Sequence, residues 1–240
     1  MKSIFLTAGR GSRLNHLTKK NHKSLLIFKD KESILGKLVD QFLKQGIKKK
    51  DITFVTGYKS KKIHQYFGQK YKYFLYKHFI KTNNLHTLIS AHKVISKSDT
   101  IISFSDIVIQ NDGINKILNK KVNKITLLVD TSKVRNGTMK ISIKDKKFIH
   151  NIGKIPRKKA NGNFIGILKI PKNKINIFKE FLKNSINKKD NHYYTEILND
   201  LIKIRKEKIQ FIDVDKYKWI EIDNLADYKK MKDNVDSFAS

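Results

Sequence analysis

The feature that most constrains the fold is the junction between an apolar run and a glycine-rich loop at the start of the chain. Residues 2–8 (KSIFLTA) are short, apolar and rich in strand formers, and residues 9–13 (GRGSR) follow directly. Such a run is typical of a strand buried on both faces of a parallel sheet. The amides of a glycine loop placed there can wrap phosphate groups, because no Cβ atom blocks the approach. The chain therefore begins as an α/β protein with a candidate phosphate loop.

Strands and helices alternate along the rest of the chain. This rhythm predicts a Rossmann-like, mainly parallel sheet flanked by helices, with right-handed crossovers. We expect helices at 33–45, 61–67, 85–95, 112–119, 175–184 and 194–203, and strands at 51–56, 73–76, 100–105, 125–129, 163–170, 209–214 and 219–223. A hairpin is expected from 139–143 and 148–152, around residues 144–147 (KDKK). Residues 1–240 then form a single domain, with a small β lobe inserted at about residues 131–170.

The charge of the chain suggests an alternative function, a basic nucleic-acid-binding module. The formal net charge is +31, but the only arginines are Arg10, Arg13, Arg135, Arg157 and Arg205. Arginine is the residue that forks onto phosphates and guanines, so a nucleic-acid reader would be richer in it. We interpret most lysines as solvated surface that speeds the arrival of polyanions such as nucleoside triphosphates, and we expect no specific nucleic-acid partner.

Composition excludes several other classes of protein. The chain has no cysteine, which excludes disulfides, thiolate zinc sites and cysteine nucleophiles. No run of about 18 or more apolar residues occurs, and the apolar residues 4–6 are too few for a signal peptide. We expect a cytoplasmic protein without a membrane partner, acting as a monomer or a homodimer.

The spacing within the glycine loop excludes two common phosphate-binding motifs. Position 14 is leucine, so the dinucleotide fingerprint is absent, and no Gly-Lys-Ser/Thr follows, so the P-loop is absent too. Residues 6–14 (LTAGRGSRL), together with Leu17, Thr18 and Lys23, instead resemble the opening motif of the nucleotidyltransferase family that activates sugar phosphates, phosphocholine and phosphonates. That family usually has a proline before the lysine, where this chain has His22.

The resemblance implies roles for the loop residues. It assigns the nucleotide to Ala8, Gly9, Gly11, Ser12 and Arg13. Lys23 would neutralise charge at the α-phosphate or the acceptor phosphate, so Arg13 and Lys23 are the catalytic candidates. Nucleotidyl transfer depends on positioning and on cations, so no protein nucleophile is required. An ordinary glycine turn is the plain alternative.

Two acidic residues resemble the metal ligands of that family. Asp106 closes the strand at 100–105, and the carboxyl ends of such strands are where open α/β sheets bind ligands. Residues 219–228 (WIEIDNLADY) match the C-terminal segment of the family, whose strand-end aspartate completes a Mg²⁺ site. Asp106 and Asp223 are therefore the expected Mg²⁺ ligands, and Glu221, on the same strand face as Asp223, is in reserve. Helix capping by Asp223 or Asn224 is the alternative.

The middle of the chain narrows the resemblance to cytidylyltransferases. Residues 81–91 (KTNNLHTLISA) are similar to a Thr-Asn block of the enzymes that act on phosphocholine and 2-aminoethylphosphonate, and the segments 105–108, 128–130, 151–154 and 163–166 follow in the same order. Further candidates for the nucleotide site are Gly57, Asn83, Asn84 and Ser105. The candidates for the acceptor site are Asp130, Gly153, Tyr194 and Glu196. The pair Tyr193-Tyr194 with Glu196 could cradle an ammonium group, or could simply form a packing face of a helix.

These features together predict an enzyme. We expect a Mg²⁺-dependent cytidylyltransferase that transfers CMP from CTP to a small phosphorylated or phosphonate acceptor, of the phosphocholine or 2-aminoethylphosphonate type, and releases pyrophosphate. The inserted lobe would bind the acceptor. A sugar-1-phosphate nucleotidylyltransferase that uses UTP or dTTP is the alternative enzyme.

Overall fold

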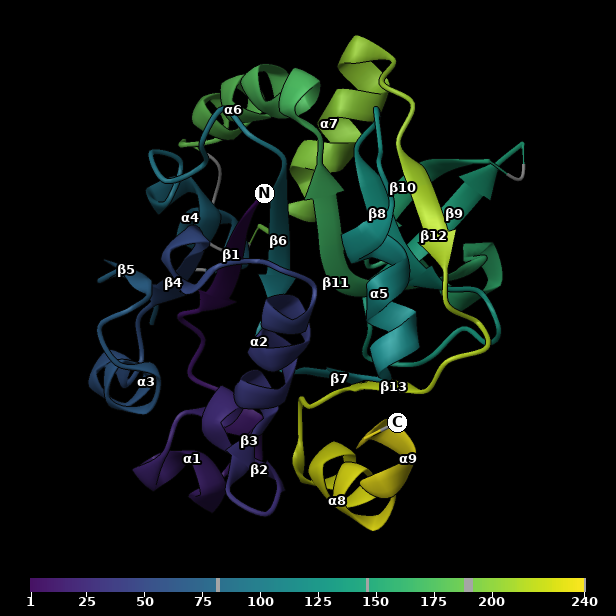
Figure 1. The fold of residues 1–240 in the computed structure, drawn as a ribbon. Helices are drawn as coiled ribbons and strands as arrows, with labels where there is room; N and C mark the ends of the chain where they lie inside the picture. Colours follow the sequence, from purple (N-terminus) through teal and green to yellow (C-terminus); the bar gives the residue numbers. More distant parts are fainter. Residues whose placement is uncertain (81–82, 146, 188–191, 240) are drawn as a thin grey trace.

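The chain folds around one large mixed β-sheet (Figure 1). The computed structural model describes residues 1–80, 83–145, 147–187 and 192–239. Within these residues the sheet has nine strands: the order is β10-β9-β11-β6-β1-β4-β5, and β8 pairs with both β11 and β12. The strands are β1 (Lys2–Thr7), β4 (Ile52–Thr56), β5 (Lys72–Leu75), β6 (Thr100–Phe104), β8 (Thr126–Asp130), β9 (Lys140–Lys144), β10 (Phe148–Gly153), β11 (Gly162–Ile170) and β12 (Gln210–Asp213).

Four neighbouring strands, β6, β1, β4 and β5, run parallel to one another. Their C-terminal ends therefore lie along the same edge of the sheet, and β1 ends between Thr56 of β4 and Phe104 of β6. The strand β11 runs antiparallel to β6, β8 and β9. The prediction of a Rossmann-like α/β fold with a parallel core and flanking helices is confirmed.

The long strand β11 joins the expected lobe to this sheet. Its first residues pair with β9 and its last residues pair with β6, so one edge of the strand changes partner along its length. Gly166 lies at the irregularity between the two halves, with φ at 93°, and a Cβ atom there would come within 2.8 Å of the Phe104 ring. Residues 131–170 thus extend the main sheet through the β9–β10 hairpin; Lys146, in the expected turn, lies outside the described residues.

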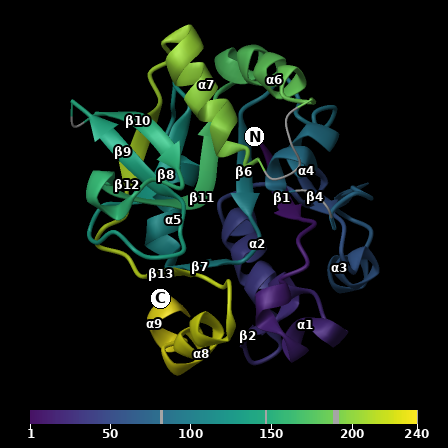
Figure 2. The ribbon, with the colours of Figure 1, turned by 180° about the vertical axis from the view of Figure 1, so that it is seen from behind.

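Helices cover both faces of the sheet, and each face has its own apolar core (Figures 1 and 2). One face packs against α2 (Ile34–Lys44), α3 (Ser60–Phe67) and α5 (Asn111–Asn119), and the other against α4 (Asn84–Ser90), α6 (Ile175–Asn184) and α7 (Thr195–Arg205). Strand β1 serves both cores, because Phe5 points to the first and Ile4 and Leu6 to the second. Full burial of each such side chain contributes about 1.5–3 kcal/mol to the stability of the fold. The burial of side chains on both faces therefore favours the central position of this strand.

A buried lysine ties β11 to the end of α5. Lys169 is 4% exposed, and its Nζ donates hydrogen bonds to the carbonyl oxygens of Ile117, Leu118 and Lys120 at 3.2, 3.1 and 2.7 Å. The last carbonyls of a helix have no partner within the helix, so a cation is favoured there. Burial nevertheless lowers the pKa of Lys169 below its usual value.

The C-terminal segment returns to the start of the chain. The strand β13 (Trp219–Glu221) pairs with β7 (Ile107–Ile109) outside the main sheet, and α8 (Leu225–Asp233) and α9 (Asp236–Ala239) follow it. A third apolar core, which includes Leu14, Phe28 and Met231, joins α8 to the glycine loop. The remaining elements are α1 (His16–Lys20), β2 (Ile27–Lys29), β3 (Glu32–Ser33) and the 3₁₀ turns η1 (Ser12–Leu14), η2 (Lys23–Leu25), η3 (Lys49–Asp51), η4 (Arg157–Lys159) and η5 (Lys172–Lys174).

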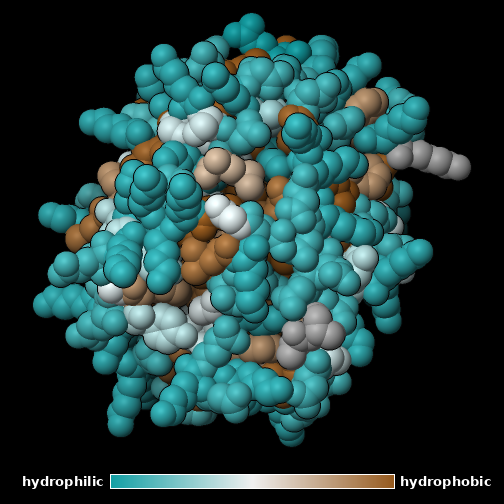
Figure 3. Space-filling model, viewed as in Figure 1, coloured by the Kyte–Doolittle hydropathy of each residue, from teal (hydrophilic) through white to brown (hydrophobic). Residues whose placement is uncertain are grey.

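The surface agrees with the composition. The face shown in Figure 3 is mostly hydrophilic, as expected for a chain with a net charge of +31. None of the helices in the described part of the chain is long and apolar enough to cross a membrane.

Candidate active site

A hollow of about 500 Å³ lies at the C-terminal ends of β1 and β6. Most of the predicted nucleotide, catalytic and metal residues line it: Ala8, Gly9, Arg13, Lys23, Asn83, Asn84, Ser105, Asp106 and Asp223. Glu221, the reserve candidate, lines it as well. These predicted residues therefore come together at the carboxyl-end edge of the parallel strands, where the strand-end rule for α/β sheets expects a ligand site.

Three acids meet in this hollow. Carboxylate oxygens of Asp106, Glu221 and Asp223 all lie within 4.8 Å of one another. Asp106 follows β6, and its carbonyl oxygen accepts a hydrogen bond from the amide of Ile222 at 2.9 Å, which holds the last strand against the first acid. Burial, together with the other two acids, raises the pKa of Glu221 well above its usual range; burial and Asp106 also raise the pKa of Asp223. Such a cluster favours a bound cation, and oxygen ligands of this kind suit Mg²⁺.

Asn224, and not Asp223, caps the following helix. The side chain of Asn224 accepts a hydrogen bond from the amide of Asp227, and the Asp227 carboxylate accepts in return from the Asn224 amide, forming a capping box. The capping alternative for Asp223 is therefore excluded, and its carboxylate faces the hollow.

Lys23 is the principal counter-charge of the acids. Its Nζ contacts Oδ2 of Asp106 and lies 3.9 Å from Oδ1 of Asp223. Burial disfavours the ammonium charge, but Asp106 and Asp223 outweigh it and raise the pKa of Lys23 above its usual value. Arg13 contributes a second cation: its guanidinium lies 3.2 Å from Asp223, and 66% of its side chain is exposed. Ser12, in η1, is exposed and does not line the hollow.

His22, which stands where the resembled family has proline, anchors the segment before Lys23. Its side chain is fully buried, and Nδ1 accepts a hydrogen bond from the amide of Ser24 at 3.2 Å. Burial and the neighbouring charge of Lys23 lower the pKa of His22 to about 4. A neutral imidazole thus performs the turn-fixing role that a rigid proline ring would otherwise have.

A chain of hydroxyl groups ties this segment to the sheet. Ser24 Oγ donates to Ser105 Oγ at 2.7 Å, and Ser105 Oγ donates to the carbonyl oxygen of Leu6 at 2.9 Å. Ser105, predicted to bind nucleotide, lines the hollow but uses its hydroxyl hydrogen in this connection.

The other predicted nucleotide residues differ in their placement. Asn83 and Asn84 line the hollow, and Asn84 Oδ1 accepts a hydrogen bond from the Tyr194 amide at 2.9 Å. Asn83 stands at the N-terminus of α4 without a side-chain capping bond, and the preceding Lys81 and Thr82 of the motif lie outside the described residues. Gly57 does not line the hollow, because the Phe79 ring lies over it, 2.8 Å from where a Cβ atom would be.

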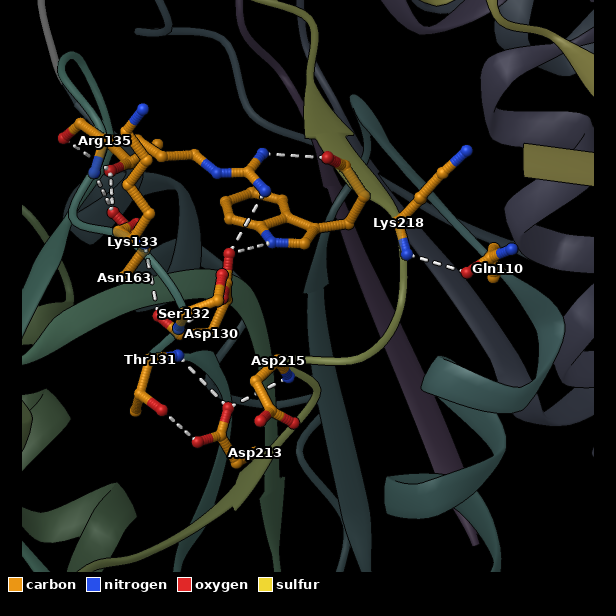
Figure 4. A network of polar contacts seen from close by, with 12 residues as sticks. Gln110, Asp130, Thr131, Ser132, Lys133, Arg135, Asn163, Asp213, Asp215 and Lys218 are labelled. Carbon is orange, nitrogen blue, oxygen red and sulfur yellow. Dashed lines mark hydrogen bonds and ion pairs between the residues drawn. The ribbon is translucent and has the colours of Figure 1, made fainter. Parts of the chain in front are cut away.

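The structure corrects the assignment of Asp130 to the acceptor. Asp130 is 1% exposed, and its Oδ2 accepts a hydrogen bond from the Trp219 indole at 2.7 Å and lies 3.1 Å from the Arg135 guanidinium. Arg135 also stacks over the Trp219 ring, at 4.2 Å from its centroid, and its amide donates to Asn163 Oδ1. Figure 4 shows how these contacts fasten the loop after β8 to β11 and to the start of β13. Asp130 therefore holds this loop in place, and the chain reaches the hollow seven residues later, at Gly137.

Tyr194 also lies away from the hollow. Its side chain is fully buried among Phe104 and Phe164 in the core, which is the helix-packing alternative. Its neighbour Tyr193 lines the hollow instead. Gly153 and Glu196 line a second hollow of about 710 Å³, which shares Lys154 and Tyr193 with the first.

Several lining residues were not among the predicted site residues. They are Phe79, Thr87, Phe104, Gly137, Thr138, Met139 and Lys154, whereas Tyr193 was expected as part of a possible ammonium cradle. Lys154 is the last residue of the segment 151–154 that the resemblance singled out, but no role was assigned to it. Phe79 and Met139 are apolar residues of irregular segments, which look the same in a sequence whether they face a ligand or a core.

Comparison with known proteins identifies a family and several relatives of the chain. A family model described as nucleotidyl transferase matches residues 2–236. The CTP:phosphoglutamine cytidylyltransferase of Campylobacter jejuni is 29% identical over 257 residues, which cover 95% of this chain and 97% of the relative. The CTP:phosphocholine cytidylyltransferase of Streptococcus pneumoniae superposes with a TM-score of 0.73 at 18% identity, covering 97% of both chains. The inositol-1-phosphate CTP transferase of T. maritima gives 0.75 at 17% identity, covering 100% of this chain and 97% of the other.

Proposed function

Because this chain belongs to the nucleotidyl transferase family, we propose that it transfers CMP from CTP to a small acceptor that carries a phosphate or phosphonate, with release of pyrophosphate. The observation that carries this proposal is the meeting of the glycine loop, Lys23 and three acids in one hollow. Phosphate-wrapping amides, a buried cation and a candidate metal site are the parts that such a transfer needs.

The reaction requires no nucleophile from the protein. An oxygen of the acceptor attacks the α-phosphorus of CTP, the new phosphorus–oxygen bond forms, and the bond to the β-phosphate bridge breaks as pyrophosphate leaves. Mg²⁺, when bound, supplies Lewis-acid stabilisation of the phosphate charge, and Asp106 and Asp223 would hold it, with Glu221 close enough to join them. Lys23 and Arg13 add positive charge on the same side of the hollow.

The preference for CTP is supported by the relatives. The C. jejuni protein and the two structural neighbours are all named for CTP, whereas their acceptors differ: phosphoglutamine, phosphocholine and inositol 1-phosphate. The CTP donor that these three proteins share, with their different acceptors, fits a site in which the glycine loop serves the nucleotide and the far side of the hollow serves the acceptor.

The test is a matrix of four nucleoside triphosphates against phosphate-bearing acceptors, with pyrophosphate release as the readout. We expect turnover with CTP above that with UTP, dTTP or ATP. Asp106→Asn should abolish pyrophosphate release even at saturating Mg²⁺. Preferred use of UTP or dTTP with glucose 1-phosphate would instead favour the sugar-phosphate alternative.

A further inference from the structure

The hollow that holds the acids and the second hollow share two lining residues. Lys154, which follows β10, and Tyr193, which precedes α7, line both of them. An acceptor whose phosphate lies in the first hollow, near the acids and Lys23, can therefore extend its other end into the second. The second hollow adds Lys159 from η4 and Glu196 from α7. The side chains there select what the far end of the acceptor can be.

The groups that could hold an ammonium ion are already engaged. The Lys154 ammonium lies 4.9 Å from the centroid of the Tyr193 ring, so a cation of the protein occupies that aromatic face. Glu196, the acid among the described residues that line the second hollow, contacts His192 Nδ1 and accepts a hydrogen bond from the Tyr193 amide at 3.2 Å. Tyr194, the other aromatic residue expected for an ammonium cradle, is buried in the core.

Two lysine side chains of the second hollow can bind the far end of an acceptor. Lys154 and Lys159 are both exposed, and no salt bridge among the described residues includes either of them. A cationic far end of the acceptor would meet two like charges, whereas an anionic end would form charge-assisted hydrogen bonds with them.

We propose that the acceptor carries an anionic group, such as a carboxylate, at the end opposite its phosphate, and that Lys154 and Lys159 bind that group in the second hollow. The proposal rests on the proposed function, because it names the class of acceptor for the same transfer. It departs from the phosphocholine-type acceptor predicted from the sequence, whose far end is a quaternary ammonium.

A panel of short phosphate monoesters tests the charge of the far end. With CTP and Mg²⁺, kcat/KM is compared for phosphoglycolate (carboxylate), glycerol 3-phosphate (neutral) and phosphocholine (quaternary ammonium) at one ionic strength. We expect phosphoglycolate to exceed phosphocholine by about tenfold or more, the scale of a charge-assisted hydrogen bond. Equal use of the three acceptors, or a preference for phosphocholine, would overturn the proposal while the cytidylyl transfer stands. No pyrophosphate from any acceptor with any nucleotide would instead refute the proposed function.

Charge-reversal variants then test the residues. Lys159→Glu should raise the KM for phosphoglycolate about tenfold or more and leave the KM for CTP unchanged. It should also reduce the difference in kcat/KM between phosphoglycolate and phosphocholine. Lys158→Glu is the matched control, because Lys158 is exposed on the same 3₁₀ turn but lines neither hollow. Lys154→Glu should act in the same direction as Lys159→Glu. If Lys159→Glu behaves as Lys158→Glu does, Lys159 does not bind the acceptor and the assignment fails.

Discussion

Gly11 lies directly against the stem of Lys23. A Cβ atom at position 11 would come 2.8 Å from Cβ and 2.9 Å from Cδ of Lys23, and the backbone of Gly11 is left-handed, with φ at 64°. The glycine of the loop thus leaves room for the lysine that reaches the acids, in addition to any contact of its amide with phosphate.

Gly11→Ala should therefore reduce activity more than it reduces stability. The added methyl group must displace Lys23 from Asp106, so we expect kcat to fall by about tenfold or more, the scale of one misplaced charged group. Gly46→Ala is the control: its φ is 80°, but no atom lies within 4 Å of the new methyl group. Both variants should lose about 1 kcal/mol of unfolding free energy from backbone strain. Equal kcat values for the two would show that Lys23 is not displaced.

His22 should make stability depend on pH below neutrality. Its pKa is lowered to about 4 in the folded chain, below the ordinary value of 6.5, so the unfolded chain binds more protons between these values. Stability is complete above pH about 6.5 and falls as the pH drops toward 4, by up to about 3 kcal/mol. His22→Gln should flatten this part of the curve, measured by urea unfolding from pH 4 to 8. His16→Gln, at an exposed position of the same segment, should retain the wild-type slope.

Glu221→Gln should stabilise the metal-free protein. Burial and two neighbouring carboxylates disfavour the charge of Glu221, so a neutral amide relieves repulsion and Tm should rise. If Glu221 also binds Mg²⁺, the increase in Tm on adding Mg²⁺ should be smaller for the variant than for the wild type. A lower Tm without metal, measured by calorimetry in EDTA, would mean that the carboxylate is held by interactions more favourable than this repulsion.

Arg135→Met should loosen the loop that carries Gly137 into the hollow. The variant leaves the buried Asp130 carboxylate with one charged partner fewer, at a cost of about 2 kcal/mol, reduced from the value for a fully buried pair because a third of the Arg135 side chain is exposed. Asp130→Asn in the same chain should recover part of this loss. Trp219, the single tryptophan, reports the change by fluorescence. Arg157→Met, at an exposed position, should change neither the free energy of unfolding nor the fluorescence of Trp219.

Lys169→Met tests the buried lysine. The change keeps the volume of the stem but leaves the carbonyl groups of Ile117, Leu118 and Lys120 without their donor, so we expect a loss of about 1–3 kcal/mol in urea unfolding. Lys172→Met, at an exposed position two residues after β11, should cost less than about 0.5 kcal/mol. If Lys169→Met leaves the free energy of unfolding unchanged, water replaces the ammonium group at the end of α5.

The sequence predicted the elements of the site better than it predicted the partners of each side chain. The end of a buried strand can be predicted from the sequence, because the apolar run stops where the chain reaches the edge of the sheet. Asp106 was identified in this way. Asp130 also ends a strand, and the resemblance made it a candidate for the acceptor site, yet a distant tryptophan and arginine cover it. Such coverage depends on residues about 89 positions away, as for Trp219, and no local pattern encodes it.

The choice between Tyr193 and Tyr194 shows a second limit. Adjacent residues before a helix point in different directions, and which one enters the core depends on the register of the helix. The expected helix began at Tyr194 and the observed α7 begins at Thr195, a shift of one residue that is ordinary at helix ends. The sequence also left open whether Asp223 or Asn224 caps the last long helix. The capping box between Asn224 and Asp227 in the structure shows that Asn224 is the cap.

The pairing of Lys23 with Asp223 has a consequence for synthesis of the protein. These residues stand 200 positions apart, at 23 and 223, and the acids of the hollow come from both the middle and the end of the described chain. A growing chain on the ribosome therefore exposes Lys23 and Asp106 long before the segment that supplies Glu221 and Asp223 is made. A nascent fragment that ends before residue 221 therefore contains the glycine loop, Lys23 and Asp106 but lacks two of the three acids of the hollow.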